Sequence, residues 1–375
     1  MKVTVLTPDL SHNCLGRAHL LAQLLERNFD VEIVGPKLGE SIWSPVKDDY
    51  EYKSVNNGPR VYEFAVDVPE LVNLIEGDVI LASKPRVTSY GIALLKSLKD
   101  DIPVILDIDD WETGFKFSDG KVKTLLKDIP RLINTGSFYY TRTLESLSGL
   151  ADARTVSNRF LQSKFGGEII PHARDTAVFA PDRFDKQAVR QEFNLPLCDD
   201  VIMFSGTPRP HKGVDHLVKA VSQMDRGNTK VVIVGAHESE YVDELQQLGG
   251  DKLILRGQQP FSEIPKWIAA ADVIAIPQKD SPATKGQVPA KVFDAMAMGK
   301  PIVATQVSDL PEILDGCGVL VPSESVTDLR DAIECLLADE EQRNALGKRA
   351  REKCIEQYSY DAITPHLADI VELVR

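Results

Sequence analysis

The stretch PAKVFDAMAMGKPIVA, residues 289–304, decides the fold and also points to a ligand. A short helix is predicted to begin near Lys291, and a Gly-Lys-Pro turn then leads into an apolar strand at 302–304. The helix follows an apolar strand at 273–276 and a long loop, and in open α/β sheets ligands bind beyond the carboxyl ends of strands, at helix N-termini. Because Lys291 can neutralise phosphate and Asp294 can accept hydrogen bonds from sugar hydroxyls, the stretch predicts a site for a phosphate-bearing ligand.

Short apolar strands alternate with helical patterns along most of the chain, which is typical of mostly parallel sheets. The strands expected in the first half cover residues 2–7, 31–34, 79–82, 104–108 and 153–156, with a first crossover helix at 15–27. The second half repeats the pattern with strands at 201–205, 230–234, 253–255, 273–276, 302–304 and 318–321, closed by helices at 328–337, 340–358 and 360–374. Since 375 residues exceed what one hydrophobic core usually fills, we expect an α/β protein with two Rossmann-like domains facing a central cleft.

Proline content and periodicity set the expected domain boundaries. We predict an N-terminal domain at 1–172, a linker at 173–200, a C-terminal domain at 201–358, and a C-terminal helix at 359–375 that packs back on the N-terminal domain.

Charge and cysteine usage exclude several classes of function. A formal charge of −13 argues against broad nucleic-acid binding, which depends on lysine and arginine neutralising phosphates. Five scattered cysteines without a C-x-x-C pair predict neither a disulfide framework nor a zinc site, and they fit a reducing cytosol. The chain opens on a strand pattern rather than a signal peptide, and no apolar run approaches the ~20 residues that span a bilayer. We therefore expect a cytoplasmic protein.

One basic segment, residues 116–133, interleaves lysines and Arg131 with apolar residues. Such a helix can lie peripherally on an anionic membrane, here the inner face, or can simply pack its apolar side on the protein core. Pro130 interrupts the helical pattern, which favours packing on the core.

A second ligand motif, SGTPRPHKGVDHL, covers residues 205–217. A strand is predicted to end at Ser205, a loop carrying Gly206 and Thr207 follows, and a helix begins near residue 213. The N–H groups at that helix start favour an anion, and Arg209 and Lys212 add formal charge. The alternative is a solvated loop with two surface cations, but the Lys291 and Asp294 segment in the same half favours an anion site.

These two motifs together resemble the C-terminal half of the retaining family-4 glycosyltransferases with a GT-B fold. The family has a Gly-x-x-x-x-x-Lys-Gly loop and a later helix of the type Pro-x-Lys-x-x-Glu-Ala-Met-Ala-x-Gly-x-Pro, matched here by residues 206–213 and 289–304. The resemblance implies that Lys212 contacts a diphosphate, that Asp294 holds ribose hydroxyls, and that the backbone near Gln259 reads the base edge. Pro289 and Lys291 complete the implied donor site, with Gly206 and Thr207. The segment 169–181, IIPHARDTAVFAP, is similar to the family's interdomain linker.

The chain departs from the family pattern at two places in this half. The family often carries two glutamates eight positions apart; here the later position holds Asp294, one methylene shorter, and the earlier holds Gly286. The arginine that usually follows the loop glycine is Thr207, and Arg209 is the residue that can substitute for it.

The N-terminal half offers a second set of polar residues in PVILDIDDWE, residues 103–112. Asp107 and Asp109 have the spacing of a D-x-D metal motif, but no metal is expected because cations are already available for the phosphates and because GT-B enzymes generally need none. We interpret Asp109 as a carboxylate that orients a sugar or acceptor hydroxyl, while Asp107 or Asp110 can instead cap the next turn.

The first crossover helix carries a weaker signal. Gly16 stands at its start, where the family has glycines that let the backbone approach a diphosphate or an acceptor, and Arg17 can reach a phosphate or lie on the surface.

The resemblance implies an enzyme that transfers a sugar, with retention, from a nucleoside-diphosphate sugar to a hydroxyl of a glycan, lipid or small molecule. Asp109, Arg209 and Lys212 are the expected catalytic residues, the donor is a substrate and not a cofactor, and UDP-sugars are favoured over GDP- or ADP-sugars. The alternative is a non-catalytic nucleotide-sugar binder or scaffold of the same fold. A nicotinamide-dependent dehydrogenase is disfavoured because no predicted strand is followed by Gly-x-Gly-x-x-Gly. The base, sugar, acceptor and oligomeric state are not fixed by the sequence.

Overall fold

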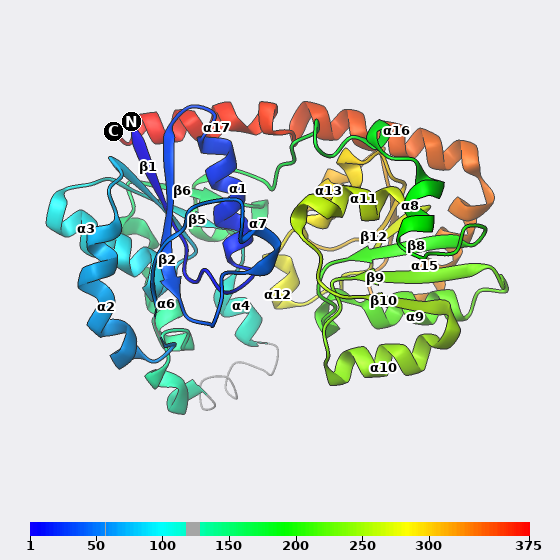
Figure 1. Ribbon diagram of the computed structural model, residues 1–375, viewed down its shortest axis with the longest axis horizontal. Coiled ribbons are helices and arrows are strands. Elements are labelled where there is room, and N and C mark those ends of the chain that lie inside the picture. Colours follow the sequence, from blue (N-terminus) through cyan, green and yellow to red (C-terminus); the bar gives the residue numbers. More distant parts are fainter. Residues whose placement is uncertain (57, 118–127) are drawn as a thin grey trace. The chain divides into compact units, whose positions relative to one another are not determined.

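The protein forms two compact units (Figure 1). The computed structural model describes residues 1–56, 58–117 and 128–375. The first unit contains residues Met1–His172 and Ile363–Arg375, and the second contains Ala173–Ala362. The chain thus crosses between the units twice.

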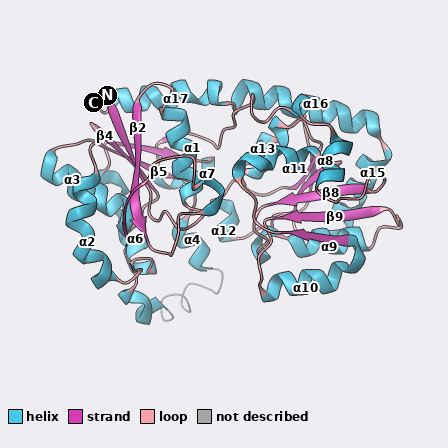
Figure 2. Ribbon diagram, viewed as in Figure 1, coloured by secondary structure: helices cyan, strands magenta, loops and turns pink. Residues whose placement is uncertain are grey.

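The first unit is built on a parallel sheet, which has seven strands in the described residues, in the order β3-β2-β1-β4-β5-β6-β7 (Figure 2). The strands are β1 (Lys2–Leu6), β2 (Asp30–Lys37), β3 (Lys53–Asn56), β4 (Val79–Ser83), β5 (Val104–Ile108), β6 (Ala153–Val156) and β7 (Glu168–Ile169). Strands β4 and β5 are buried throughout, as near-continuous apolar runs in a sheet covered on both faces should be.

Helices cover this sheet and complete its core. They are α1 (Leu15–Leu25), α2 (Val61–Leu74), α3 (Ile92–Asp100), α4 (Glu112–Lys116), α6 (Phe138–Ser146), α7 (Arg159–Phe165) and α17 (Tyr360–Leu373). Residues of α2, α3 and α7 pack with Leu6, Ile80 and Leu106 of the central strands. Helix α17 contacts α1, where the Thr364 hydroxyl donates to the Leu24 carbonyl over 3.5 Å.

The second unit has a parallel sheet of six strands in the order β10-β9-β8-β11-β12-β13. All six strands lie in the described part of the chain. The strands are β8 (Asp200–Ser205), β9 (Thr229–Val234), β10 (Leu253–Arg256), β11 (Val273–Ile276), β12 (Ile302–Thr305) and β13 (Val319–Val321). Successive side chains along a strand point to opposite faces of the sheet, so Met203 and Phe204 pack in different core clusters, one on each face.

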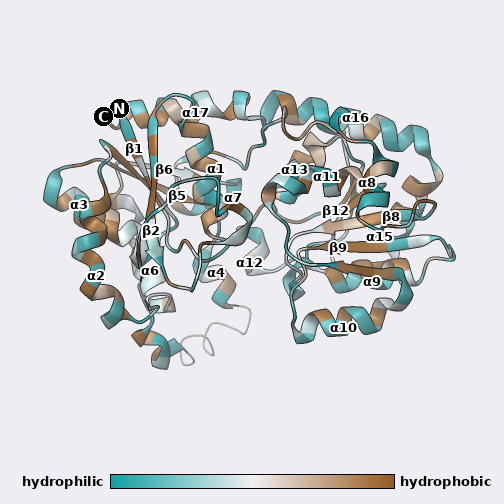
Figure 3. Ribbon diagram, viewed as in Figure 1, coloured by the Kyte–Doolittle hydropathy of each residue, from teal (hydrophilic) through white to brown (hydrophobic). Residues whose placement is uncertain are grey.

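Two helical layers sandwich this second sheet. The helices of the unit are α8 (Lys186–Glu192), α9 (Val214–Ser222), α10 (Glu240–Gly249), α11 (Ile264–Ala269), α12 (Pro282–Lys285), α13 (Lys291–Ala297), α14 (Leu310–Ile313), α15 (Val326–Ala338) and α16 (Glu340–Gln357). Helices α8, α11, α13 and α16 bury side chains in one cluster, and α9, α10 and α15 in the other. Figure 3 shows the apolar strand β9 in brown and the amphipathic helix α10 in bands of teal and brown.

The expected α/β architecture is confirmed, and most expected strands are present within a residue or two of their predicted bounds. The sequence did not predict the two outermost strands of the first sheet, β3 and β7. Only Val55 of β3 is buried and β7 has two residues, so neither shows an apolar run. Residues 173–200 were predicted as a linker; in the structure they contain α8 and place Phe179, Val189 and Leu195 in the core of the second unit.

Three further features bear on the expectations. Residues 118–127 of the basic segment lie outside the described residues, and Ile129–Ile133 at its end forms a 3-10 helix. All five cysteines, which are described, are free thiols. Within the described ranges every helix is too short or too polar to cross a bilayer.

Candidate functional site

In the second unit, the predicted ligand motifs meet where the strand order of the sheet reverses. Strands β8, β9 and β10 follow one another toward one edge, and β11 then pairs with the other side of β8. In α/β proteins the loops that flank such a reversal, here those after β8 and β11, are where ligands bind. The sequence motifs at 205–217 and 277–294 are these two loops with the helices that follow them.

Gly206 lets the backbone turn sharply as it leaves β8. Its φ is +112°, which only glycine adopts readily, and its N–H donates to the Val234 carbonyl over 2.6 Å. A Cβ at Gly206 would lie 3.1 Å from the Nζ atom of Lys291. The loop after β8 and the start of α13 are thus in contact, as the shared ligand site requires.

The ammonium of Lys291 is the most unusual group at this site. Its Nζ atom is buried and has no hydrogen-bond partner within the described residues, and it lies 3.4 Å from the centroid of the Phe204 ring. Burial lowers the pKa of Lys291 well below its usual range, the nearby charge of Lys212 lowers it further, and Asp294 opposes the shift. A buried cation that lacks a hydrogen-bond acceptor is unfavourable, and the lowered pKa of Lys291 is the consequence.

The second predicted cation, Lys212, ends the 3-10 turn Pro210–Lys212 that precedes α9, and its Nζ donates to the Thr207 carbonyl over 2.8 Å. Arg209 is exposed at the start of the same turn. The next residue, Gly213, has a φ of +65°, and a Cβ there would lie 1.9 Å from the Pro277 carbonyl oxygen. This close approach fixes the loop after β8 against the loop after β11.

The remaining predicted donor residues occupy loops and helix starts of the same unit. Asp294 is 6% exposed and its Oδ1 accepts a hydrogen bond from Arg174. The Pro289 carbonyl accepts from Val292 N over 3.0 Å at the start of α13. Gln259 is half-buried after β10, and its Nε2 donates to the Gly257 carbonyl over 3.1 Å. Gly286 ends α12, so the earlier acidic position of the family pattern offers no side chain.

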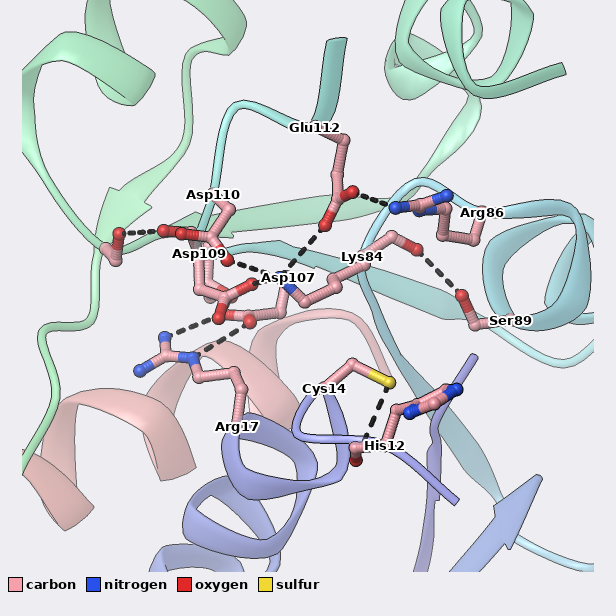
Figure 4. A network of polar contacts seen from close by, with 12 residues as sticks. His12, Cys14, Arg17, Lys84, Arg86, Ser89, Asp107, Asp109, Asp110 and Glu112 are labelled. Atoms are coloured by element: carbon pink, nitrogen blue, oxygen red, sulfur yellow. Dashed lines mark hydrogen bonds and ion pairs between the residues drawn. The ribbon is translucent and has the colours of Figure 1, made fainter. Parts of the chain in front are cut away.

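In the first unit, a network of mostly buried charges lies at the carboxyl ends of β4 and β5 (Figure 4). Lys84 follows β4, and its Nζ lies 2.7 Å from Asp109 Oδ1, 2.7 Å from Asp110 Oδ2 and 3.0 Å from Glu112 Oε1. Arg86 pairs with the other oxygen of Glu112. Lys84 is 5% exposed and has a φ of +67°, which is uncommon for a residue other than glycine.

The balance of charge in this network sets the ionisation of its members. Burial alone would lower the pKa of Lys84, but the three carboxylates raise it well above its usual range. Burial raises the pKa of Asp109 to about 7; the charges of Asp110 and Asp107 add to the rise, and Lys84 opposes it. Burial also acts on Glu112, but Arg86 and Lys84 outweigh it and lower its pKa to about 2. Asp109 is therefore a carboxyl group that changes its charge near neutral pH.

This shift predicts a pH dependence of stability that Asp109→Asn removes. A carboxyl whose pKa is higher in the folded protein than the usual 3.8 stabilises the fold below pH ~4, and that contribution is lost as the pH rises through about 7. We expect the difference in unfolding free energy between wild type and Asp109→Asn to change in favour of the variant between pH 4 and pH 8. Urea denaturation across this range measures it, and a constant difference would contradict the assignment.

Arg17 was expected either to reach a phosphate or to lie on the surface, and in the structure it is buried against Asp107. Its side chain is 1% exposed, and Nε and Nη2 donate to both oxygens of Asp107 over 3.0 and 2.8 Å, while Nη2 also donates to the Ile170 carbonyl over 2.7 Å. Arg17 is therefore not a surface residue, and its guanidinium is already bound by protein groups. A Cβ at Gly16 would lie 3.3 Å from the Trp43 ring, so this position contacts a side chain of its own unit.

The Asp107 carboxylate is occupied by protein donors: besides Arg17, the Thr155 hydroxyl donates to it over 2.7 Å. Asp107 therefore does not act as the first acid of a D-x-D metal motif. Asp107 does not cap a turn; its carboxylate forms a buried ion pair that joins Arg17 of α1 to β5. Within the described residues no group of three or more histidine, cysteine or acidic side chains is arranged to hold a metal ion.

Sequence reasoning missed Lys84, Arg86, Glu112 and Arg174. Lys84 and Arg86 directly follow the apolar run of β4, and this position at a strand end is the signal that could have been used. Arg174 lies in a segment treated as a linker, and no pattern in the sequence connects it with Asp294, 120 residues away.

Comparison with known proteins finds similarity to glycosyltransferases, in sequence over part of the chain and in fold over all of it. Residues 199–339 match the family model of glycosyl transferases group 1. A D-inositol 3-phosphate glycosyltransferase from Corynebacterium aurimucosum is 30% identical over 217 residues, which are 54% of this chain and 50% of that protein. A GDP-mannose-dependent alpha-(1-6)-phosphatidylinositol monomannoside mannosyltransferase from Mycolicibacterium smegmatis is 28% identical over 247 residues, 61% of this chain and 64% of the relative. The chain thus spans about half to two thirds of the length of these relatives.

Solved structures extend the similarity in fold to the whole chain. HepE from Anabaena, crystallised with UDP-glucose, has a TM-score of 0.80 at 18% identity and covers 100% of both chains. Sucrose-phosphate synthase from Thermosynechococcus elongatus has a TM-score of 0.75 at 16% identity, covering 100% of this chain and 99% of that one. The fold is GT-B, and residues 199–339, which match the family model of glycosyl transferases group 1, lie within the second unit.

Proposed function

We propose that this protein is a retaining glycosyltransferase that moves a sugar from a nucleoside-diphosphate sugar to a hydroxyl group of a glycan, lipid or small molecule. The observation that carries the proposal is the buried Lys291 ammonium, which has no hydrogen-bond partner in the described residues and lies beside the Gly206 loop. A diphosphate is the anion that fits a site with two lysines, a glycine turn and a carboxylate for ribose.

The donor would bind entirely in the second unit. Lys212 and Lys291 would share the diphosphate, since their charges are close enough to influence each other. Asp294 lies one helical turn beyond Lys291 on α13 and would accept hydrogen bonds from ribose hydroxyls. The backbone near Gln259, after β10, would contact the base. Exposed Arg209 would close on the diphosphate from the turn that precedes α9.

The chemistry then requires positioning and charge stabilisation. The bond between the anomeric carbon and the diphosphate oxygen breaks, a bond to the acceptor oxygen forms on the same face of the sugar, and the departing phosphate takes the acceptor's proton. Negative charge grows on the leaving group, and Lys212, Lys291 and Arg209 would stabilise it there. Each cation needs to interact more strongly with the departing diphosphate than with the bound donor to accelerate the reaction.

The acceptor would bind in the first unit. Asp109 would accept a hydrogen bond from the acceptor hydroxyl or from the transferred sugar, and Lys84 would hold the carboxylate in place. We expect Asp109→Asn to lower kcat by about 10²–10³ while donor affinity changes less than threefold, because the donor contacts lie in the other unit. Steady-state kinetics with the donor varied would separate the two effects, and an equal loss of donor affinity would contradict this role.

A non-catalytic nucleotide-sugar binder is the second candidate, because Gly286 replaces an acidic side chain that the family often has. Such a protein would bind the donor but release neither free sugar nor a glycosylated product. Incubation with UDP-, GDP- and ADP-sugars, followed by detection of free nucleoside diphosphate, distinguishes it from an enzyme.

The donor site is tested by thermal shift with UDP, GDP, ADP and their sugar conjugates. At least one should raise the Tm of wild type, and Lys212→Ala and Asp294→Ala should each need at least about tenfold more of it for the same shift. Lys230→Ala is the matched control, since Lys230 donates to the Asp251 carbonyl and takes no part in the site. Equal shifts in wild type and both site variants would refute the assignment.

A further inference from the structure

Arg174 stands two residues beyond the last residue of the first unit's main segment, and its guanidinium is completely engaged in the second unit. Its Nε donates to Asp294 Oδ1, its Nη2 to the Ala290 carbonyl over 3.2 Å, and its Nη1 to the carbonyl of Ala173 over 2.6 Å. Since Ala290 immediately precedes α13, Arg174 binds both the start of the donor-site helix and the carboxylate that this helix carries.

The orientation of this guanidinium is fixed from several sides. The rings of Phe179 and Phe261 have their centroids 5.8 and 5.4 Å from its central carbon. The Arg174 backbone is held as well: its N–H donates to the Tyr358 carbonyl over 2.9 Å, and its carbonyl accepts from Tyr360 N over 3.0 Å. Arg174 is 5% exposed, so close packing restricts the movement of its side chain.

The engagement of Asp294 is one-sided. Arg174 takes Oδ1, and Oδ2 has no hydrogen bond from the residues that the structure describes. An aspartate is shorter than the glutamate of the family pattern, so its carboxylate lies closer to the helix and reaches a ribose only in a suitable rotamer. A planar arginine bound to one oxygen holds that rotamer and leaves the other oxygen as an acceptor.

We propose that Arg174 is a positioning residue for the donor: it fixes the Asp294 carboxylate so that its second oxygen accepts hydrogen bonds from the ribose hydroxyls. The inference rests on the proposed function, because it needs a nucleotide in the second unit. It assigns the discrimination between ribose and its deoxy analogues to the Arg174 and Asp294 pair.

A structural role alone would have a different signature. If Arg174 only joined the linker to α13, its loss would lower stability and weaken all nucleotides alike. If it positions Asp294, its loss removes the preference for ribose and leaves the affinity for a nucleotide without ribose hydroxyls almost unchanged.

The experiment compares UDP, GDP and ADP with their 2′,3′-dideoxy forms by isothermal titration calorimetry on the full chain. Wild type should bind one ribonucleotide at least about tenfold more tightly than its dideoxy form, as expected for hydrogen bonds to a charged group. In Arg174→Met this ratio should fall to within about twofold of one, with the dideoxy affinity retained, and Asp294→Asn should behave likewise. Arg183→Met is the matched control, because Arg183 is an exposed arginine of the same segment and should keep the ratio of wild type.

Arg174→Lys keeps the charge but lacks the planar guanidinium, and it provides a second variant if the methionine variant fails to fold. A ratio of ribonucleotide to dideoxynucleotide affinity in Arg174→Lys that is clearly below the wild-type ratio supports the proposal. If any folded Arg174 variant keeps the wild-type ratio of ribonucleotide to dideoxynucleotide affinity, the proposal is overturned while donor binding stands. The same holds if wild type binds the ribonucleotide and its dideoxy form equally. A wild type that binds none of the three diphosphates overturns the proposed function itself and this inference with it.

Discussion

Replacing Lys291 by methionine will raise the thermal stability of the unliganded protein and weaken its affinity for nucleoside diphosphates. The ammonium is buried over the Phe204 ring without a hydrogen-bond acceptor from the described residues, so folding transfers it from water to an unfavourable site. Methionine has a similar length and no charge, and it fits an apolar pocket without leaving a polar group unsatisfied. For a domain of this size, each kcal/mol gained raises Tm by about 2–4 °C.

The sign of the pH dependence follows from the lowered pKa of Lys291. Between its folded and unfolded pKa values the unfolded chain binds the additional proton, so wild-type stability rises with pH in that interval. The methionine variant lacks this dependence, and its advantage over wild type should shrink as the pH approaches 10. Differential scanning calorimetry at pH 7 and pH 9.5 measures the effect.

Binding should change in the opposite direction. Charge-assisted hydrogen bonds are worth about 1.5–3 kcal/mol, so their loss should weaken diphosphate binding by about 10–100-fold. Lys285→Met is the matched control, because Lys285 is exposed at the end of α12 and should change neither property. A less stable Lys291→Met variant that still binds diphosphate would show that Lys291 serves the core and not the ligand.

Replacing Lys84 by methionine will destabilise the first unit by about 3–5 kcal/mol, because it removes the cation shared by the buried carboxylates of Asp109 and Glu112 and the partly exposed one of Asp110. Methionine has the same backbone preferences as lysine at the positive φ, so the loss reports the charge and not the turn. Chemical denaturation, followed by far-ultraviolet circular dichroism, measures the change.

Two further variants identify the source of this loss. Adding Asp109→Asn to Lys84→Met removes one of the uncompensated charges and should recover part of the stability, which a double-mutant cycle reveals as a coupling energy. Lys47→Met breaks an exposed pair with Asp48 in the same unit and should change stability far less. Equal losses in Lys84→Met and Lys47→Met would mean that the buried network does not depend on Lys84.

The fold was largely predictable because alternating strands and helices leave a strong periodic signal. The pattern located β5 and β11 at their observed bounds, since each is a largely apolar run framed by turn residues. Strands β3 and β7 were not predictable, because a short edge strand buries few side chains and so needs no apolar run.

The candidate site was predictable only where its residues are close in sequence. Gly206 and Lys212 share one loop, and Lys291 and Asp294 share one helix turn, so spacing alone groups them. The pairing of Arg174 with Asp294 and of Arg17 with Asp107 joins residues 120 and 90 positions apart, and only the fold brings such groups together. The burial of Lys291 and the raised pKa of Asp109 depend on these tertiary surroundings in the same way.

Calorimetric titration of wild type with UDP, GDP and ADP at several pH values between 7 and 9.5, each in two buffers of different ionisation enthalpy, tests the central claim most directly. A diphosphate that binds beside Lys291 favours its protonated form, so binding should take up protons in the part of this range where unliganded Lys291 loses its proton, and the observed enthalpy should differ there between the buffers. We expect at least one diphosphate to bind with proton uptake in wild type, and the uptake to disappear in Lys291→Met. Binding without any buffer dependence, or the absence of binding by all three diphosphates, would contradict the assignment of the donor site.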